Sequence, residues 1–459
     1  MRNIENYASE VQQELKERLD YDELMNCMRC GFCLPSCPTY TQTNKNEAAS
    51  PRGRIALMKG VVDGVIEPDE DFEEQLNLCL GCRACEPVCP SGVKYGHLLE
   101  EARDVLEQKK KHKWPVKVMR HLVFEEFFPK KDRIRRLNNL LWLYQKSGVQ
   151  KVVQKSKVLN VLPGNLANME SILPEIPAPK EMKNRPEHLD PFNVEAPKKR
   201  VAFFAGCLMD TMFMPTNDAT VKLLQLAGCE VFIPPAQGCC GALHAHSGEK
   251  NGAKELAKQN IRAFEELDVD YIISNAGGCG AFLIDYDHLL KDDPEWYERA
   301  KAFVLKTKDI SEVLVELDFH EKPLAVQPQV VTYQDSCHLR NVMRTSSAPR
   351  KLLKSIEGVT FKEMKDPDQC CGSAGVYNIV QQDMSMQILD SKMEKAKATQ
   401  AQTIVTANPG CLLQMKLGIK REKMESNAKA VHIVDLLLEA YEGAASGEDN
   451  IREVAVTDS

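Results

Sequence analysis

Two groups of four cysteines near the N-terminus have the spacing of metal ligands. Each group follows the pattern C-x2-C-x2-C-x3-C-P. The first group consists of Cys27, Cys30, Cys33 and Cys37. The second lies 52 residues further along the chain (79 − 27) and consists of Cys79, Cys82, Cys85 and Cys89. Thiolates at such intervals bind zinc or iron–sulfur clusters, and cysteines can otherwise pair as disulfides.

The spacing favours two [4Fe-4S] clusters. Three thiolates two residues apart can hold three corners of one cubane, while the fourth, beyond a wider gap, reaches the other cluster. We therefore assign the first cluster to Cys27, Cys30, Cys33 and Cys89, and the second to Cys79, Cys82, Cys85 and Cys37. Zinc is disfavoured because a structural zinc site is complete with two Cys-x2-Cys pairs, and disulfides are less favoured still.

Eight further cysteines form a twofold repeat in the C-terminal half. Each copy has one cysteine, then an adjacent pair followed by glycine, then a last cysteine, at offsets of 130 to 132 residues between the copies. The copies are Cys207, Cys239, Cys240 and Cys279, and Cys337, Cys370, Cys371 and Cys411. Gly241 and Gly372 can take a positive φ, which lets the backbone approach an inorganic core. Each copy could bind one [4Fe-4S] cluster; buried apolar cysteines are the alternative for either pair.

Side chains near these cysteines are weaker candidates. His244, His246 and His338 could ligate or tune a cluster, or make ordinary hydrogen bonds. Arg52 and Arg54, in the segment SPRGRI between the first two groups, could tune the potential of the negatively charged clusters, or lie in a surface turn.

Strands and helices alternate around the repeat. We expect strands at 200–205, 230–233 and 271–274, with counterparts at 330–333, 359–362 and 403–406, and helices at 216–227, 249–267, 384–398 and 431–441. This alternation predicts parallel sheets, in which ligands gather where strands end, and most of the cysteines follow a strand. Cys229 is out of register with the repeat and is expected to be a small buried residue at the start of a strand.

The regions together predict an α+β protein of several domains. Its 459 residues are enough for about three. We expect a mostly α-helical two-cluster domain at 1–108, opening with a helix over 7–25. Basic amphipathic helices and a proline-rich linker without a fold of its own should follow at 109–198. The two repeats, with small parallel sheets, are expected at 199–325 and 326–442, and a disordered tail at 443–459.

The basic segment contrasts with the rest of the chain. Between Lys109 and Asn160 there are 15 lysines or arginines against three acids, in a protein of net charge -7. Interleaved apolar residues such as Trp114, Phe127 and Leu140 would let this segment lie on an anionic membrane surface. Docking on the protein's own domains or on an acidic partner is the alternative. The overall acidity argues against nucleic acid as the main partner.

Several signals are missing from the sequence. No signal peptide or membrane span is recognisable, so clustered cysteines among the 17 of the chain indicate metal chemistry in a reducing cytoplasm. Neither G-x-G-x-x-G before a helix nor G-x-x-x-x-G-K-[ST] occurs, and we expect no flavin, nicotinamide or nucleotide site. Clusters without a substrate site are typical of an electron carrier.

From about Met25 to Tyr441 the chain resembles a known family. The resemblance rests on the two N-terminal cysteine groups, SPRGRI, FFAGC ending at Cys207, the two CCG sites and DSCHLR ending at Arg340. This combination resembles the iron–sulfur subunit of glycolate oxidase, and its repeats resemble the CCG domains of heterodisulfide reductase. The resemblance implies a 2-hydroxy-acid dehydrogenase complex, for glycolate or lactate, with an FAD-containing partner protein. Electrons would pass to a membrane quinone or another acceptor, in the cytoplasm or at the inner face of the membrane.

Both repeats depart from the full CCG pattern, which closes with C-x-x-C and supports non-cubane clusters in heterodisulfide reductase. Ala276 and Asn408 stand at the first position of that pair. Their presence favours ordinary cubanes, or one empty site, over an enzyme that itself reduces a disulfide. A binding module in which clusters or zinc are only structural is the third hypothesis.

Overall fold

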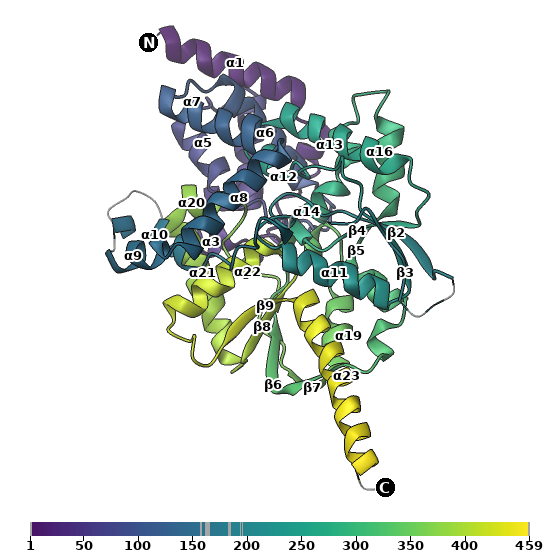
Figure 1. Ribbon diagram of the computed structural model, residues 1–459. Helices are drawn as coiled ribbons and strands as arrows, with labels where there is room; N and C mark the ends of the chain where they lie inside the picture. The colour runs from purple at the N-terminus through teal and green to yellow at the C-terminus, as the bar shows by residue number, and fades with distance from the viewer. Residues whose placement is uncertain are drawn as a thin grey trace.

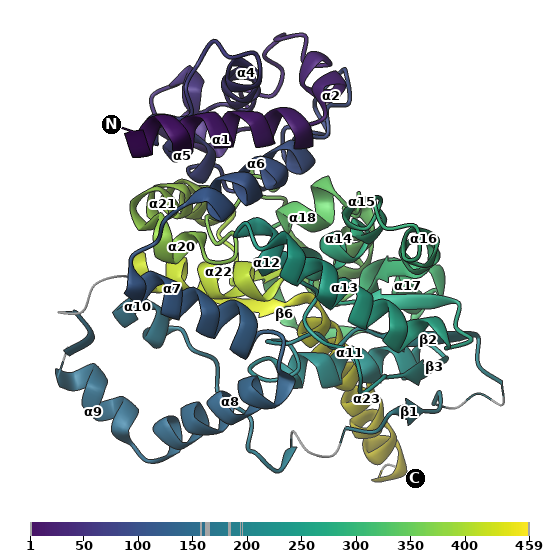
Figure 2. The ribbon, with the colours of Figure 1, turned by 90° about the horizontal axis from the view of Figure 1, so that it is seen from above.

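The computed structural model describes residues 2–156, 158–160, 166–181, 185–192, 194 and 196–457. A helical N-terminal region lies at one end of the molecule, on top of two small sheets and their helices (Figures 1 and 2). This arrangement confirms the predicted α+β class.

The N-terminal region is helical, as predicted. It contains α1 (Arg2–Arg18), α2 (Tyr21–Met25), α3 (Pro38–Gln42), η1 (Glu47–Ala49), α4 (Pro51–Val62), α5 (Glu70–Asn77) and α6 (Tyr95–Lys109). The single helix expected over 7–25 is interrupted at Asp20, whose carboxylate caps α2 by accepting a hydrogen bond from the Glu23 amide. Leu15, Met58 and Leu99 are buried where α1, α4 and α6 pack together. Each such side chain contributes roughly 1.5–3 kcal/mol through burial.

The basic segment forms helices on one side of the molecule (Figure 2). They are α7 (Trp114–Arg120), a π-helical turn η2 (His121–Phe127), α8 (Lys131–Lys146), α9 (Val149–Ser156), η3 (Val158–Asn160) and α10 (Leu166–Ser171). Phe124 is buried against the ring of His244, Arg120 pairs with Glu249 at 2.7 Å, and Lys131 pairs with Asp210 at 2.8 Å. One side of the segment therefore docks on the first repeat, as the second alternative expected.

Two parallel sheets carry the repeats, as predicted. The first has the order β1-β3-β2-β4-β5 and the second β7-β6-β8-β9. The strands are β1 (His188–Leu189), β2 (Lys199–Phe203), β3 (Cys229–Phe232), β4 (Tyr271–Ser274), β5 (Thr307–Asp309), β6 (Ala325–Tyr333), β7 (Glu357–Phe361), β8 (Thr403–Thr406) and β9 (Lys429–His432). All pairs are parallel except β1 with β3. Buried residues of both sheets, among them Val201, Phe203, Val331 and Tyr333, belong to one continuous core.

Helices flank both sheets (Figure 1). Those of the first repeat are α11 (Met214–Leu226), α12 (Ala242–His246), α13 (Lys250–Glu265), α14 (Gly277–Leu283), α15 (Tyr286–Leu289), α16 (Tyr297–Lys306), α17 (Ile310–Glu316) and η5 (Phe319–Glu321). Those of the second are α18 (Cys337–Asn341), α19 (Ser347–Lys354), α20 (Tyr377–Val380), α21 (Gln382–Ala398), α22 (Pro409–Arg421) and α23 (Ile433–Thr457). Among the described residues, no helix combines the length and apolar character needed to cross a bilayer.

Three details differ from the sequence-based expectations. The linker is not wholly without structure, because it contributes β1, which pairs antiparallel with β3; its residues 161–165, 182–184, 193 and 195 lie outside the described residues. The helix expected over 431–441 starts only after β9. The tail expected to be disordered from 443 continues α23 to Thr457, anchored by the buried residues Leu436, Leu437 and Ala440.

Candidate iron–sulfur sites

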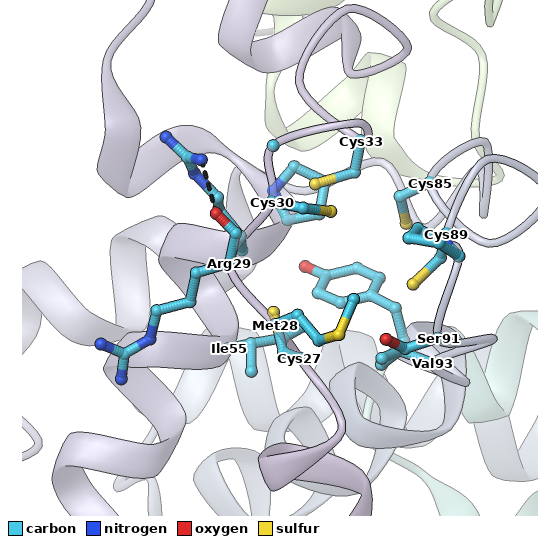
Figure 3. A pocket seen from close by; sticks show the side chains of 15 residues that line it. Cys27, Met28, Arg29, Cys30, Cys33, Ile55, Cys85, Cys89, Ser91 and Val93 are labelled. Carbon is cyan, nitrogen blue, oxygen red and sulfur yellow. Dashed lines mark hydrogen bonds between the residues drawn. The ribbon is translucent and has the colours of Figure 1, made fainter.

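The first cysteine group surrounds a pocket near the surface of the N-terminal region. Cys27, Cys30, Cys33 and Cys89 line this pocket, together with Cys85 of the second group (Figure 3). The loop after α2 turns at Gly31, which has φ 87°. Cys30 is exposed, whereas Cys27, Cys33 and Cys89 are partly buried. The residues expected to share the first cluster therefore lie together, including the cysteine from the second group.

The second group lies deeper. Cys79, Cys82, Cys85 and Cys37 are all at most 9% exposed. Burial raises the pKa of Cys82 and Cys85 well above the usual thiol value, and the nearby Cys79 and Cys37 thiols contribute to the rise. The Gly81 amide and the Tyr95 hydroxyl both donate to the Cys79 sulfur, at 3.4 and 3.5 Å. Such donors stabilise a thiolate ligand.

Arg54 lies beside the second group and pairs with no carboxylate among the described residues. Its side chain is fully buried and donates to the Thr39 hydroxyl at 3.1 Å and the Gln75 carbonyl at 2.6 Å. Its Nη1 is buried with no hydrogen-bond partner in the described part of the chain. Burial opposes its charge, but the neighbouring Cys79 and Cys37 thiols raise the pKa of Arg54. A buried cation held only by neutral partners costs several kcal/mol, so an anionic cluster held here fits the residues present.

Arg52, the other arginine of the SPRGRI segment, has a different environment. Its Nε pairs with the Glu47 carboxylate at 2.5 Å, and its Nη1 donates to the Arg29 carbonyl at 2.9 Å. Arg52 thereby supports the backbone of the loop between Cys27 and Cys30. Arg52 also lines the pocket of the first group, near Cys33. Each arginine of the segment thus lies beside one cysteine group, and Arg54 is the buried one.

Each repeat brings its four cysteines together. In the first repeat the sulfurs of Cys207 and Cys239 are 3.7 Å apart, and the Cys240 and Cys279 thiols are hydrogen-bonding neighbours. In the second, Cys337 contacts Cys370, and Cys371 contacts Cys411, in the same way. Gly241 and Gly372 have φ 91° and 90°, as expected for turns that carry adjacent ligands.

The strand–helix alternation explains how these thiols converge. Cys279, Cys337 and Cys411 lie in the first turns of α14, α18 and α22, which follow β4, β6 and β8. Helix N-termini carry a partial positive charge that favours an anionic ligand. The four-thiol geometry and the charge at the helix ends both suit an iron–sulfur cluster; the residue-by-residue ligand assignment stays a prediction.

Asn408, which replaces a cysteine of the full CCG pattern, connects the two repeats. Its Nδ2 donates to the Cys411 sulfur at 3.6 Å, and its Oδ1 accepts from the Gly278 amide at 2.9 Å. Gly278 precedes Cys279 of the first repeat. The corresponding residue there, Ala276, has no polar side chain to play this part.

The three histidines make ordinary hydrogen bonds. His244 Nε2 lies 2.7 Å from the Phe124 carbonyl, His246 Nδ1 lies 2.9 Å from Glu100, and His338 Nε2 lies 2.9 Å from the Gly81 carbonyl. Burial lowers the pKa of His338 to about 4, so this ring is neutral near pH 7. Cys229 is fully buried at the start of β3, as expected.

The second N-terminal group packs directly on the second repeat. Leu80, Cys82 and Ala84 share an apolar cluster with Cys370, and Cys337 packs against it. The contact is reinforced by hydrogen bonds from Asn341 Nδ2 to the Cys82 carbonyl at 2.9 Å and from the Tyr377 hydroxyl to the Leu78 carbonyl at 2.8 Å. Sequence reasoning missed Asn341 and Tyr377, because no local pattern marks a residue that contacts a loop some 260 or 300 positions away.

The two repeat sites are neighbours in turn. Cys371 and Cys411 of the second repeat belong to one buried cluster, and Cys279 of the first packs against it. Shared apolar clusters therefore connect the cysteines in a series, in the order first group, second group, second repeat, first repeat. The loop of the second group also contacts the first repeat directly, through an ion pair between Arg83 and Asp285.

Comparison with known proteins identifies each of these parts. A model described as a 4Fe-4S dicluster domain matches residues 23–93, and a cysteine-rich domain matches residues 201–284 and 331–416. A third model, described as the linker region of the glycolate oxidase iron-sulfur subunit, matches residues 115–173. The dicluster and cysteine-rich matches support iron–sulfur clusters as the cofactor of this chain.

Named relatives share most of the length. The probable glycolate oxidase iron-sulfur subunit of Bacillus subtilis is 67% identical over 95% of this chain and 98% of its own length. The glycolate oxidase iron-sulfur subunit of Escherichia coli is 31% identical over 89% of this chain and 94% of its own. Lactate utilization protein A of Exiguobacterium is 35% identical over 53% of this chain and 99% of its own. The chain thus belongs to the family of glycolate oxidase iron–sulfur subunits, which are parts of an oxidoreductase complex.

Proposed function

We propose that this chain is the electron-transfer subunit of a flavin-dependent 2-hydroxy-acid dehydrogenase complex. A partner flavoprotein oxidises the acid, and this chain relays the electrons to a membrane quinone or another acceptor. Glycolate is the substrate indicated by the names of two relatives that match over about nine-tenths of the chain or more, with lactate as the alternative. The clusters supply one-electron storage, and the protein's part is to bind them, bury them and adjust their potentials.

The observation that carries this proposal is the unbroken packing from one cysteine group to the next. The loop around Cys82 lies against Cys337 and Cys370, and Cys279 packs against the buried cluster that contains Cys371. Electron transfer needs closely spaced carriers. A binding module whose clusters only stabilise the fold would not need its cysteine groups to lie next to one another. The proposed ligands are those assigned from the sequence: Cys27, Cys30, Cys33 and Cys89; Cys79, Cys82, Cys85 and Cys37; and the four cysteines of each repeat.

Burial bears on the alternative activity, reduction of a disulfide at a repeat. Cys239, Cys240, Cys370 and Cys371 are at most 4% exposed. A disulfide substrate would have to reach a ligand or an iron next to these thiols. Their burial and the two replaced cysteines, Ala276 and Asn408, both favour the relay.

The exposed end of the series is the proposed docking site of the flavoprotein. Cys30 is the exposed member of the first group, and Met28 and Phe32 beside it are 68% and 66% exposed. What distinguishes these two apolar side chains from other exposed ones is their place beside the exposed ligand of the first cluster, and Met adapts readily to a partner. A flavin-bearing protein seated here would bring its cofactor close to the first cluster.

Glycolate, mixed anaerobically with the flavoprotein and this chain, is expected to reduce the clusters, as seen by EPR. Met28→Glu and Phe32→Glu should slow this reduction at least tenfold, because each places a charge in the proposed contact. Leu305→Glu is the matched control, since Leu305 is 82% exposed on α16 and lies in the first repeat. No reduction of the wild-type chain by glycolate and the flavoprotein would contradict the proposed function.

The basic segment is the proposed membrane-facing side. Trp114, Leu140 and Val152 are 75%, 65% and 67% exposed, and exposed cations such as Lys117 and Lys151 accompany them. The chain should float with vesicles containing anionic phosphatidylglycerol, at roughly 1 kcal/mol per cation near the lipid, and lose this binding when Trp114 and Leu140 are changed to Ser. Recovery with neither anionic nor neutral phosphatidylcholine vesicles would argue for a protein partner, and equal recovery with both would show that the cations do not contribute to binding.

A further inference from the structure

The two repeats have equivalent backbones but different polar residues at their cysteines. A Cβ on Gly241 would lie 3.3 Å from the Ala253 carbonyl, and a Cβ on Gly372 would lie 2.6 Å from the Ser385 carbonyl, so α13 and α21 pack on the two CCG turns in the same way. The offset between these helices is therefore 132 residues (385 − 253). At this offset Lys392 of the second repeat corresponds to Asn260 of the first (392 − 132).

Lys392 is a fully buried cation next to the second repeat's cysteines. Its Nζ donates to the carbonyls of Asp366 and Pro367, at 3.0 and 2.8 Å. Leu389 and Met393, its neighbours on α21, belong to the buried cluster that contains Cys371 and Cys411. Burial lowers the pKa of Lys392 to about 8, and the Cys371 thiol opposes this lowering. Lys392 is thus a buried charge held by neutral partners, on the turn of α21 that packs with these cysteines.

The buried acid near Lys392 is already neutralised. The Asp335 carboxylate accepts hydrogen bonds from Nη1 of Arg340 at 2.6 Å and from both terminal nitrogens of Arg350 at 2.9 Å. Asp335 therefore does not cancel the lysine. In the first repeat, the corresponding residue Asn260 carries no charge. Its side-chain amide donates to the Cys239 carbonyl and accepts from the Gly238 amide, both at 2.8 Å.

Asn408 adds to the same asymmetry. Its Nδ2 donates to the Cys411 sulfur, whereas Ala276, its counterpart, offers no donor to Cys279. Hydrogen bonds to ligand sulfurs and nearby positive charge both stabilise the reduced, more negative state of a cluster. The effect of a charge is largest where burial excludes water, as at Lys392.

We propose that Lys392 and Asn408 hold the cluster of the second repeat at a higher reduction potential than that of the first, so that an electron on the repeats resides mainly at the second. This rests on the proposed function in one respect, that both repeats bind clusters. The step is the transfer of one electron between clusters; no bond forms or breaks, and no proton moves. The second repeat would then act as the electron store between the N-terminal clusters and the first repeat.

The test is an EPR-monitored redox titration of the full chain and three variants. Lys392→Met and Asn408→Ala are each expected to lower the midpoint potential of the second repeat's signal and to leave the other signals in place. Asn408→Ala introduces the residue that the first repeat already has at this position, so this variant is expected to fold. It keeps the inference testable if Lys392→Met fails to fold. Lys397→Met is the matched control, because Lys397 lies on the same helix α21 but pairs with Glu422 at the surface, at 2.6 Å.

The outcomes separate this inference from the proposed function. A second-repeat signal whose midpoint is unchanged in both variants, or is shifted as much by Lys397→Met, would overturn the inference and leave the relay standing. A wild-type chain without any second-repeat signal would overturn both. A wild-type second-repeat potential below that of the first repeat would also overturn the inference.

Discussion

A Cys89→Ser variant is expected to lose the cluster of the first cysteine group and to keep that of the second. A Cys37→Ser variant is expected to do the reverse. Cys89 lines the pocket of the first group, and Cys37 lies among the buried cysteines of the second. Each change should remove one EPR signal and about four iron atoms per chain.

Cys229→Ser is the matched control for these variants. Cys229 is a buried cysteine of the first repeat's core, away from the four-thiol groups, so its replacement should leave the iron content unchanged. Suppose instead that Cys37→Ser removed the signal of the first group and Cys89→Ser that of the second. Each four-cysteine motif would then bind a cluster by itself. The crossed assignment would then be wrong.

Cys337→Ser is expected to interrupt the relay in its middle. The N-terminal clusters should still be reduced by glycolate and the flavoprotein, because their cysteines are untouched. Transfer to a quinone acceptor should fall at least a hundredfold, since the first repeat's cysteines pack with those of the second repeat and, in the described part of the chain, share no apolar cluster with the N-terminal cysteines. The two rates are measured separately, by EPR after rapid freezing and by quinone absorbance.

Unimpaired quinone reduction in a Cys337→Ser chain that lacks the second-repeat signal would contradict the order of the series. It would mean that electrons leave from the N-terminal clusters directly. The Cys229→Ser chain again serves as the control, with both rates expected to match the wild type.

Local patterns were sufficient to predict the cysteine groups and the parallel sheets. Regular spacing identified the four-thiol sets, and the strands at 271–274 and 403–406 were placed at the residues where β4 and β8 occur. Short strands without a clear apolar pattern were missed: Thr307–Asp309 has three residues and Lys429–His432 starts with an exposed lysine.

Long-range features could not be predicted from local patterns. The sequence offered Arg54 only as one of two arginines in a turn-like segment, and burial beside Cys37 and Cys79 depends on how α4 packs. Likewise, Asn408 was visible as a missing ligand, but not as a hydrogen-bonded link from Cys411 to Gly278. Contacts between distant segments decided both roles.

The central claim is that all four cysteine groups bind clusters and together form one relay. Iron and acid-labile sulfide, counted on anaerobically purified protein before a reductive EPR titration, test this most directly. Four cubanes predict about 16 iron and 16 sulfide per chain. About 8 of each, with signals from the N-terminal groups only, would contradict the claim.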